Sequence, residues 1–137
     1  MRLKPIGIHV RARIDPPAWF LADEPDVRSY FALEDVATEF DIQGLELDWV
    51  AMCWDANFCR EGRIGTTTIF AGARWEHINV PICAAYLVNA YRVLLTRARQ
   101  GMVIYLPYGS EIDDTRKSAF YDETYAFLCE SGANELT

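Results

Sequence analysis

The chain lacks the phosphate-binding loop of nucleotide hydrolases, because no Gly-x-x-x-x-Gly-Lys-Ser/Thr stretch occurs anywhere in its 137 residues. That loop cradles the phosphates and carries the hydroxyl that binds Mg²⁺, so we expect no ATP hydrolysis by this chain alone. An acidic pair directly after an apolar strand is missing too. Asp113-Asp114 follows a turn that contains proline and glycine, and Asp23-Glu24 lies directly before Pro25.

Residues suited to metal binding or nucleophilic catalysis are scarce. The two histidines, His9 and His77, are isolated, and no serine or cysteine motif places a nucleophile beside either. No C-x-x-C pair occurs among the four cysteines, which favours buried reduced thiols over a zinc site or a disulfide. We therefore predict no metal site and disfavour an independent small enzyme, since no complete set of catalytic groups is visible.

Long apolar runs are absent as well. The longest is far shorter than the ~18–20 residues of a membrane-spanning helix, and residues 1–13 alternate charges with short apolar pairs rather than forming a signal peptide. We therefore expect a cytoplasmic protein without a membrane partner. With 51% hydrophobic residues, a chain of 137 residues can bury one core, so we expect one small domain.

The net charge of −7 differs from that of a typical nucleic-acid-binding protein, which has a basic surface. Against this acidic background, Arg92, Arg97 and Arg99 form a local basic cluster. Such a cluster is enough to bind a nucleotide and is less suited to a duplex.

Helix-like and strand-like segments alternate along the chain, which predicts an α/β fold with a mostly parallel sheet and helices on its faces. Residues 1–30 are an irregular lead-in, with a short strand at 8–14 and a short helix that starts at Asp15. The remaining predicted elements are strands at 36–40, 48–54 and 102–106, a hairpin of 66–70 with 74–78, and helices at 81–98 and 118–129.

Two polar segments interrupt these apolar elements. The turn at residues 43–46 (QGLE) joins two predicted strands, and the segment 91–99 (YRVLLTRAR) ends the first long helix and precedes a strand. Loops at strand ends are where open α/β sheets bind ligands, and the forked donors of arginine suit phosphate. Together the two segments are typical of half of a nucleotide site.

Two motif-like segments are each followed by a predicted strand: residues 38–46 (TEFDIQGLE) and residues 91–99. This order resembles that of motifs V and VI in superfamily 1 helicases. More narrowly, the chain resembles the C-terminal part of the Schlafen-group-3-like DNA/RNA helicase family, whose members are predicted P-loop ATPases. The resemblance implies a three-layer RecA-like domain of the P-loop NTPase type, with the hairpin as an insertion. Residues 31–137 would form most of this domain, and residues 1–30 would be its cut edge.

The resemblance also implies roles for individual residues. Arg97 matches the motif VI arginine that reaches the γ-phosphate across a domain cleft. Glu46 matches the motif V carboxylate that contacts the nucleotide sugar, and Gln43 and Gly44 match the turn that brings backbone amides toward phosphate. Thr38 matches the motif V threonine on the nucleic-acid side.

The implied function is the C-terminal half of a helicase or of a nucleic-acid-stimulated ATPase. ATP and Mg²⁺ would bind only in a complete enzyme, and no cofactor is expected in this chain alone. The expected partners are an N-terminal RecA-like domain with a Walker loop, from the same gene or a separate chain, and DNA or RNA. The alternative is a non-enzymatic interaction module that docks onto a separate P-loop protein.

Simpler roles remain open for the same residues. Arg97 pairs with an acid in the simpler interpretation, and Gly44 only supplies a positive φ. Glu46 is then a solvated turn carboxylate, and Thr38 a threonine with ordinary strand propensity. For Arg92 we expect an ion pair with an acid such as Asp122 or Glu46, and Arg99 follows the preference of cations for a helix C-terminus.

Overall fold

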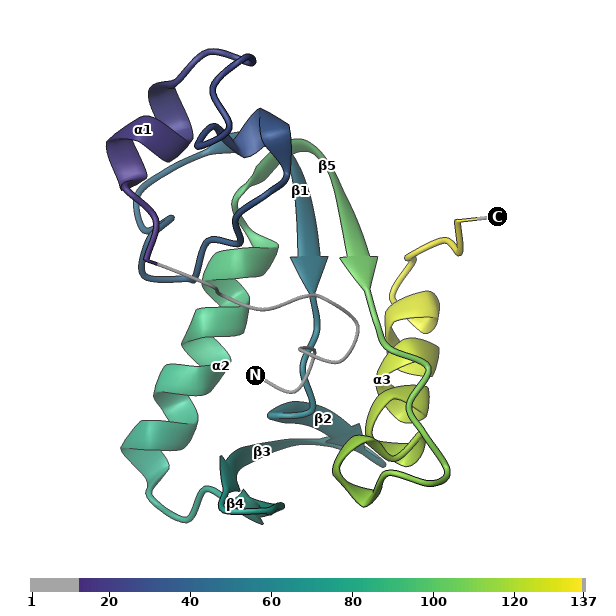
Figure 1. Ribbon diagram of the computed structural model, residues 1–137. Helices are drawn as coiled ribbons and strands as arrows, with labels where there is room; N and C mark the ends of the chain where they lie inside the picture. Colours follow the sequence, from purple (N-terminus) through teal and green to yellow (C-terminus); the bar gives the residue numbers. More distant parts are fainter. Residues whose placement is uncertain (1–12, 137) are drawn as a thin grey trace.

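Two small β-sheets and two long helices make up most of the structure, a computed structural model that describes residues 13–136 (Figure 1). The elements are α1 (Pro16–Leu21), η2 (Tyr30–Ala32), β1 (Leu47–Cys53), β2 (Phe58–Glu61), β3 (Ile64–Ala71), β4 (Arg74–His77), α2 (Pro81–Leu95), β5 (Ala98–Tyr105), η3 (Asp114–Arg116) and α3 (Ala119–Glu130).

The first sheet is a parallel pair, β1 and β5, joined through the second sheet and α2. Strands in this order need a crossover connection, and α2 supplies it by packing against one face of the pair. Buried Met52, Trp54 and Tyr91 form the core of this layer, and Ile104 and Leu94 pack around them. The other face of the pair is exposed at several of its described positions: alternate residues share a face, and Trp49, Val103 and Tyr105 are 66%, 42% and 39% exposed.

The second sheet is antiparallel, with the strand order β2-β3-β4. Its two tight turns have glycines with positive φ, Gly62 at 60° and Gly72 at 61°. Helix α3 packs against β2, and a core of Ala56, Cys59 and Tyr121 lies between them.

A third apolar cluster joins the N-terminal segment to the parallel pair. Ile14 and Trp19 pack against Ile42 and Leu47, the first residue of β1. Helix α1 begins with Pro16 and Pro17, which suit the first turn, and Asp15 occupies the N-cap position without a side-chain capping bond. Within residues 13–136, no helix is long and apolar enough to span a membrane.

The predicted α/β class is confirmed, but the mostly parallel sheet is not found. The strands in the described part of the chain form one two-stranded parallel sheet and one three-stranded antiparallel sheet. Segment 58–77 forms a sheet of its own instead of a small hairpin beside a large one, because β2 pairs with β3 along its whole length. A three-layer RecA-like arrangement is therefore not evident in this part of the chain.

The predicted strand at 36–40 is wrong, since residues 36–38 have no regular structure and a turn begins at residue 39. The carboxylate of Asp41 accepts hydrogen bonds from the backbone N–H and the hydroxyl of Thr38, at 2.9 and 2.7 Å. The carbonyl of Thr38 in turn accepts from the N–H groups of Asp41 and Ile42. This reciprocal pattern resembles a capping box, which starts a helical turn and ends any extended run.

The other elements follow the predictions more closely. β1 lies within one residue of the predicted strand 48–54, and both the hairpin and α3 are confirmed. Helix α2 stops at Leu95, three residues early, because the hydroxyl of Thr96 bonds to the carbonyls of Arg92 and Val93 and the chain then turns into β5. The predicted strand at 8–14 falls almost entirely outside the described residues.

Candidate functional site

The two polar segments singled out in the sequence meet at the amino ends of β1 and β5. The guanidinium of Arg97 donates from Nη1 to the carbonyl of Leu45 and from Nε to that of Val93, both at 3.2 Å. The N–H of Leu47 donates to the carbonyl of Arg97 at 2.9 Å. Arg97 therefore joins the end of α2 to the turn at 43–46.

The turn itself offers polar groups to solvent. Gln43, Gly44 and Glu46 are exposed, and within residues 13–136 the side chains of Gln43 and Glu46 make no hydrogen bond or ion pair. Gly44 has a φ of +85°, a conformation that favours glycine. The turn that the half-buried guanidinium of Arg97 contacts through the Leu45 carbonyl thus carries an exposed amide and an exposed carboxylate, and forked arginine donors are suited to phosphate.

The position of this site differs from the predicted one in one respect. The turn at 43–46 does not follow a strand, because 36–40 is not extended, and it precedes β1 instead. The site therefore lies at the amino edge of the parallel pair and not at the carboxyl edge, where open α/β sheets usually bind ligands.

Thr38 lies in the same segment, but its hydroxyl is already used. It donates to the carboxylate of Asp41 at 2.7 Å. A nucleic-acid contact by Thr38 stays a prediction, and this bond would have to break or be shared for the hydroxyl to donate elsewhere.

The other two arginines have separate environments. Arg92 donates to the amide oxygen of Asn89 at 2.8 Å, so the expected ion pair with Asp122 or Glu46 is wrong. Because α2 ends early, Arg99 lies inside β5 and forms a long ion pair of 3.9 Å with Asp48, between two exposed side chains. Of the three, Arg97 alone binds the turn at 43–46.

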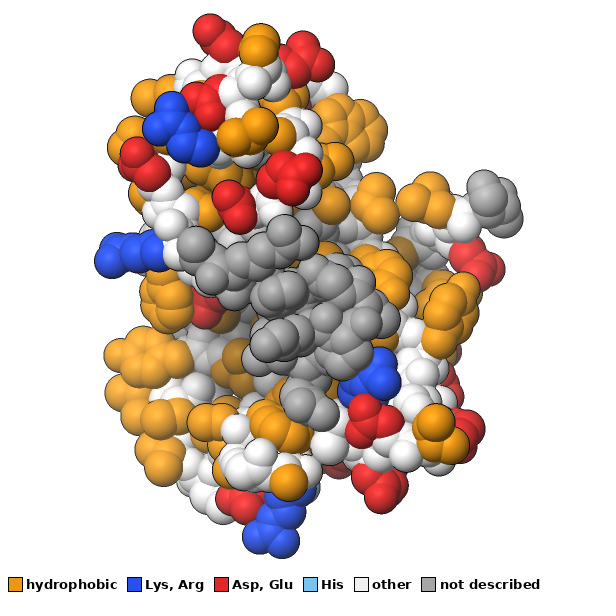
Figure 2. Space-filling view, in the orientation of Figure 1, with side chains coloured by type: hydrophobic (Ala, Val, Ile, Leu, Met, Phe, Trp, Pro, Cys, Tyr) orange, Lys and Arg blue, Asp and Glu red, His pale blue; other side chains and the backbone are white. Residues whose placement is uncertain are grey.

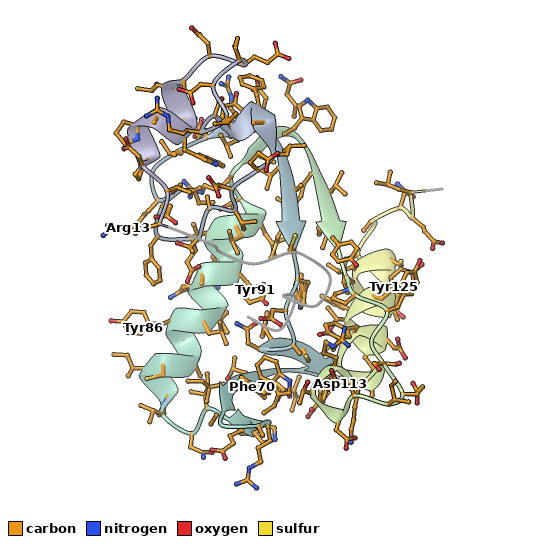
Figure 3. All side chains as sticks on the ribbon, in the orientation of Figure 1. Arg13, Phe70, Tyr86, Tyr91, Asp113 and Tyr125 are labelled. Atoms are coloured by element: carbon orange, nitrogen blue, oxygen red, sulfur yellow. The ribbon has the colours of Figure 1, made fainter. Side chains whose placement is uncertain are left out.

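Sequence reasoning missed a buried polar group at the opposite end of β1. The hydroxyl of Tyr91 donates to the amide oxygen of Asn57 at 2.6 Å and accepts from the N–H of Asp55 at 3.2 Å. Tyr91 extends from α2 toward this turn (Figure 3). Burial raises the pKa of Tyr91 far above its usual range, so the phenol stays neutral. The polar run after the strand, Asp55-Ala56-Asn57, is the signal that could have pointed to it.

The thiols of Cys53 and Cys59 are poor nucleophiles. Burial raises the pKa of Cys59 to about 12, and Cys53 shifts in the same direction for the same reason. In residues 13–136, no group of three or more His, Cys, Asp or Glu side chains could hold a metal ion.

Comparison with known proteins identifies the family. The model of a family described as Schlafen group 3, DNA/RNA helicase domain, matches residues 6–108, which include both polar segments and both parallel strands. No curated protein and no solved structure matches the chain. Because the match covers most of its length, the chain belongs to the Schlafen group 3 DNA/RNA helicase domain family.

Proposed function

We propose that this chain is the C-terminal RecA-like half of a superfamily 1-like DNA/RNA helicase or nucleic-acid-stimulated ATPase, and that Arg97 is its arginine finger. The observation that carries this proposal is the hydrogen bond between Arg97 and Leu45. It joins Arg97 to the turn that carries the exposed Gln43 and Glu46, and in this proposal the three side chains contact the phosphate and the sugar of one nucleotide.

The guanidinium can bind a phosphate without leaving its place. Arg97 uses two N–H groups for the carbonyls of Val93 and Leu45, and an arginine has five. The remaining donors can approach a phosphate oxygen when a second domain closes over this edge. A cation there stabilises the charge that develops on the transferring phosphoryl group.

The residues present fit only part of an ATP site. Glu46 would accept from a sugar hydroxyl, and the turn at Gln43 and Gly44 would bring backbone amides toward phosphate. The phosphate loop and the ligands of Mg²⁺ would come from a companion domain, because this sequence has no such loop. In this proposal the complete enzyme works in the cytoplasm on DNA or RNA.

A second candidate is a non-enzymatic module that docks onto a separate P-loop protein. The open face of the parallel pair favours it, because parallel sheets are nearly always covered on both faces. Trp49 and Val103 lie on that face and are 66% and 42% exposed.

ATPase kinetics of a reconstituted enzyme would test the finger. A phosphate-loop domain of the same family is fused to, or mixed with, this chain, and wild type is compared with Arg97→Ala and Arg97→Lys. A finger acts on the transition state, so Arg97→Ala should lower kcat by about 10³-fold or more and weaken ATP binding much less. Lysine should rescue poorly, because it keeps the charge but loses the planar fork.

Arg92→Ala is the matched control, since Arg92 is exposed on α2 and, within residues 13–136, its guanidinium donates to Asn89 alone. If Arg97→Ala leaves kcat unchanged while Arg92→Ala abolishes turnover, the finger is Arg92 and not Arg97. If neither variant changes turnover, or no turnover is reconstituted, the docking module becomes the better proposal.

A further inference from the structure

Large apolar side chains are exposed at the end of the molecule that carries α1 (Figure 1). They come from the end of α1, from η2, and from the turns between and after these two elements. Leu21, Val27, Phe31 and Leu33 are 74%, 70%, 55% and 87% exposed. We call residues 21–35 the α1 surface. Single exposed apolar residues are common on proteins, but several within one short segment indicate a surface for a partner.

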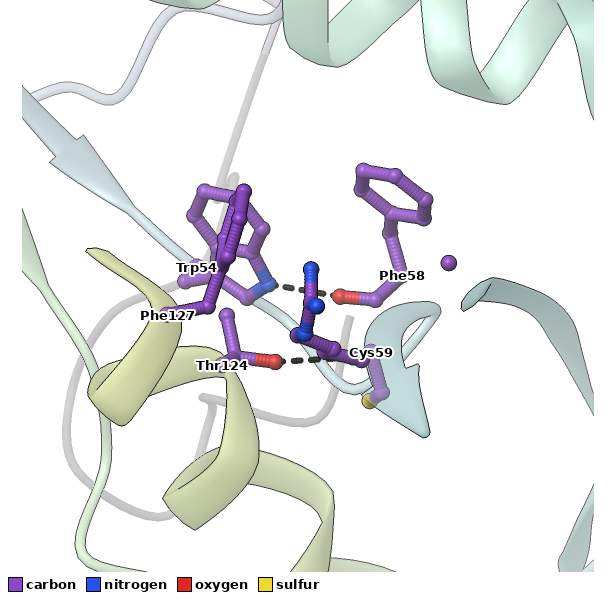
Figure 4. A pocket seen from close by; sticks show the side chains of 7 residues that line it. Trp54, Phe58, Cys59, Thr124 and Phe127 are labelled. Atoms are coloured by element: carbon purple, nitrogen blue, oxygen red, sulfur yellow. Dashed lines mark hydrogen bonds between the residues drawn. The ribbon is translucent and has the colours of Figure 1, made fainter. Parts of the chain in front are cut away.

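The apolar side chains around the pocket between β2, β3 and α3 are, by contrast, largely covered by one another (Figure 4). Trp54 on the wall of this pocket is buried, and its ring centroid lies 6.0 Å from that of Phe58. The guanidinium of Arg60 covers Phe127, 4.1 Å from the ring centroid. The pocket of about 230 Å³ therefore offers a partner less apolar area than the α1 surface does.

Hydrogen bonds hold the backbone beneath the α1 surface. The hydroxyl of Ser29, which is 2% exposed, donates to the carbonyl of Ala22 at 2.9 Å and accepts from the N–H of Phe31 at 3.4 Å. The indole N–H of Trp19 donates to the carbonyl of Asp35 at 3.3 Å. Because these bonds order the segment before a partner arrives, binding loses less free energy to ordering.

Leu33 has a backbone conformation that its side chain does not favour. It caps the C-terminal end of η2 with a φ of 56°, in the left-handed region where glycine or asparagine is usual. A leucine there costs free energy, and with 87% exposure its side chain gains little from packing within the chain. Contact with a partner explains both the residue type and its exposure, since strained residues cluster at binding sites.

The α1 surface is strongly acidic. Its fifteen residues contain five carboxylates and one arginine, so that a charge of −4 out of the net −7 lies here. Asp26 pairs with Arg28 at 2.6 Å. The other four carboxylates are exposed and form no ion pair within residues 13–136: Asp23, Glu24, Glu34 and Asp35. Acidic and hydrophobic side chains lie side by side at this end of the molecule (Figure 2).

These charges decide between the possible occupants. A second copy bound through the same surface would bring like charges together, and nucleic acids and anionic membranes would be repelled as well. We propose that the α1 surface binds a basic amphipathic segment of another protein, in which lysines or arginines flank aliphatic or aromatic side chains. Phe31 and Leu33 are the apolar anchors, and the unpaired carboxylates select the basic partner. This inference goes beyond the proposed function, because it uses neither Arg97 nor ATP.

Fluorescence anisotropy would test the anchors. A short labelled peptide, with leucines and lysines placed to give an amphipathic helix, is titrated with the whole chain at low salt and without ATP. Wild type should bind it, and Leu33→Gly and Phe31→Ala should each weaken binding about fivefold or more, as the loss of an apolar anchor does. Ile112→Ala is the matched control, because Ile112 is 99% exposed but lies between β5 and η3. It should change binding less than twofold.

The Leu33→Gly variant separates binding from folding. Glycine adopts a φ of 56° without strain, so the midpoint of thermal unfolding should be unchanged or higher while peptide binding falls. A loss of binding in a variant that is at least as stable as wild type cannot come from misfolding.

A second pair of variants tests the charge. Glu34→Lys and Glu130→Lys change the net charge equally, but Glu130 ends α3, outside the α1 surface. At low salt Glu34→Lys should weaken binding about threefold or more, Glu130→Lys less than twofold, and the difference should shrink as salt is added.

Several results would overturn the proposal. These are no binding of the leucine–lysine peptide, equal binding by wild type and Leu33→Gly, equal effects of the two lysine substitutions, or tighter binding of a leucine–glutamate peptide. A dimer in analytical ultracentrifugation that Leu33→Gly dissociates would make a second copy the occupant, and single-stranded DNA binding that Leu33→Gly abolishes would make it a nucleic acid. Because the assay contains no ATP, none of these results bears on Arg97 as the finger.

Discussion

At the scale of single residues, Arg97 has two roles that must be separated. It bonds to the carbonyls of Val93 and Leu45 within its own chain, and the proposed finger role asks it to bind a phosphate as well. The sequence could suggest that Arg97 meets an anion, because a forked donor near a glycine turn is typical of phosphate sites. The sequence could not show that Arg97 bonds to the carbonyls of Val93 and Leu45, because these bonds depend on where α2 ends and on how the turn at 43–46 folds back.

The structural part of this role predicts a loss of stability. Arg97→Ala should lower the free energy of unfolding by about 1–3 kcal/mol, because two hydrogen bonds from a charged donor are lost in a half-buried position. Arg97→Lys should recover part of this, since an ammonium can reach one carbonyl. Urea unfolding followed by circular dichroism measures both, with Arg92→Ala as the control.

A stability change below about 0.5 kcal/mol for Arg97→Ala would show that the two bonds contribute little. In that case any loss of kcat in the reconstituted enzyme would report on the phosphate contact alone.

At the scale of elements, strongly periodic segments were predictable and locally capped ones were not. The apolar face of 81–95, the strand at 47–53 and the helix at 119–130 all follow from the spacing of apolar residues. β2 was missed because it is short and carries charges, although the Gly62-Arg63 pair between Glu61 and Ile64 is a two-residue turn signal that could have revealed it.

Segment 36–40 shows how a local bond can outweigh strand propensity. Val36, Thr38 and Phe40 suit a strand, but the carboxylate of Asp41 binds both the N–H and the hydroxyl of Thr38. The turn that results, and not a strand end, is what positions Gln43 and Glu46.

Removing either partner of this turn should therefore destabilise the chain. Asp41→Ala and Thr38→Ala should each cost about 0.5–2 kcal/mol, as other N-terminal caps do. The double variant should cost clearly less than the sum, since both substitutions remove the bond between the Thr38 hydroxyl and the Asp41 carboxylate, and Asp41→Ala also removes the bond to the backbone N–H of residue 38. Thermal or urea unfolding of the wild type, the two single variants and the double variant measures the four free energies of unfolding. If the losses in the two single variants add up to the loss in the double variant, the shared bond is contradicted. A single-strand binding defect in Thr38→Ala but not in Asp41→Ala would instead favour the predicted nucleic-acid contact.

At the scale of the whole molecule, large hydrophobic side chains are exposed on a chain with a net charge of −7. Hydrophobic side chains are spread over much of the face shown in Figure 2, and acidic ones lie both around the α1 end and beside α3. The outer side of α2 adds Ile82 and Tyr86, which are 61% and 68% exposed. Large apolar patches of this kind usually mark interaction sites, which agrees with a domain that works against a companion.

Arg97 and the pocket lined by Trp54, Phe58 and Phe127 lie at opposite ends of the parallel pair. Arg97 lies before β5, and the pocket lies after β1. The sequence indicated the first end through its motif order. It could not indicate the second, because Trp54, Phe58 and Phe127 come together only when α3 packs against β2.

In the proposed function, the chain supplies one side of a phosphate site, and this predicts its behaviour in isolation. Arg97 and Glu46 would contact a nucleotide from one direction, but no segment of the sequence matches the loop that cradles the phosphates and binds Mg²⁺. The purified chain should therefore release phosphate from ATP no faster than a buffer blank, with or without single-stranded DNA. A phosphate-release assay measures this, and the fusion with a phosphate-loop domain serves as the positive control. Steady hydrolysis that co-purifies with the chain and disappears in Arg97→Ala would contradict the half-site and show that the chain completes an ATPase site by itself.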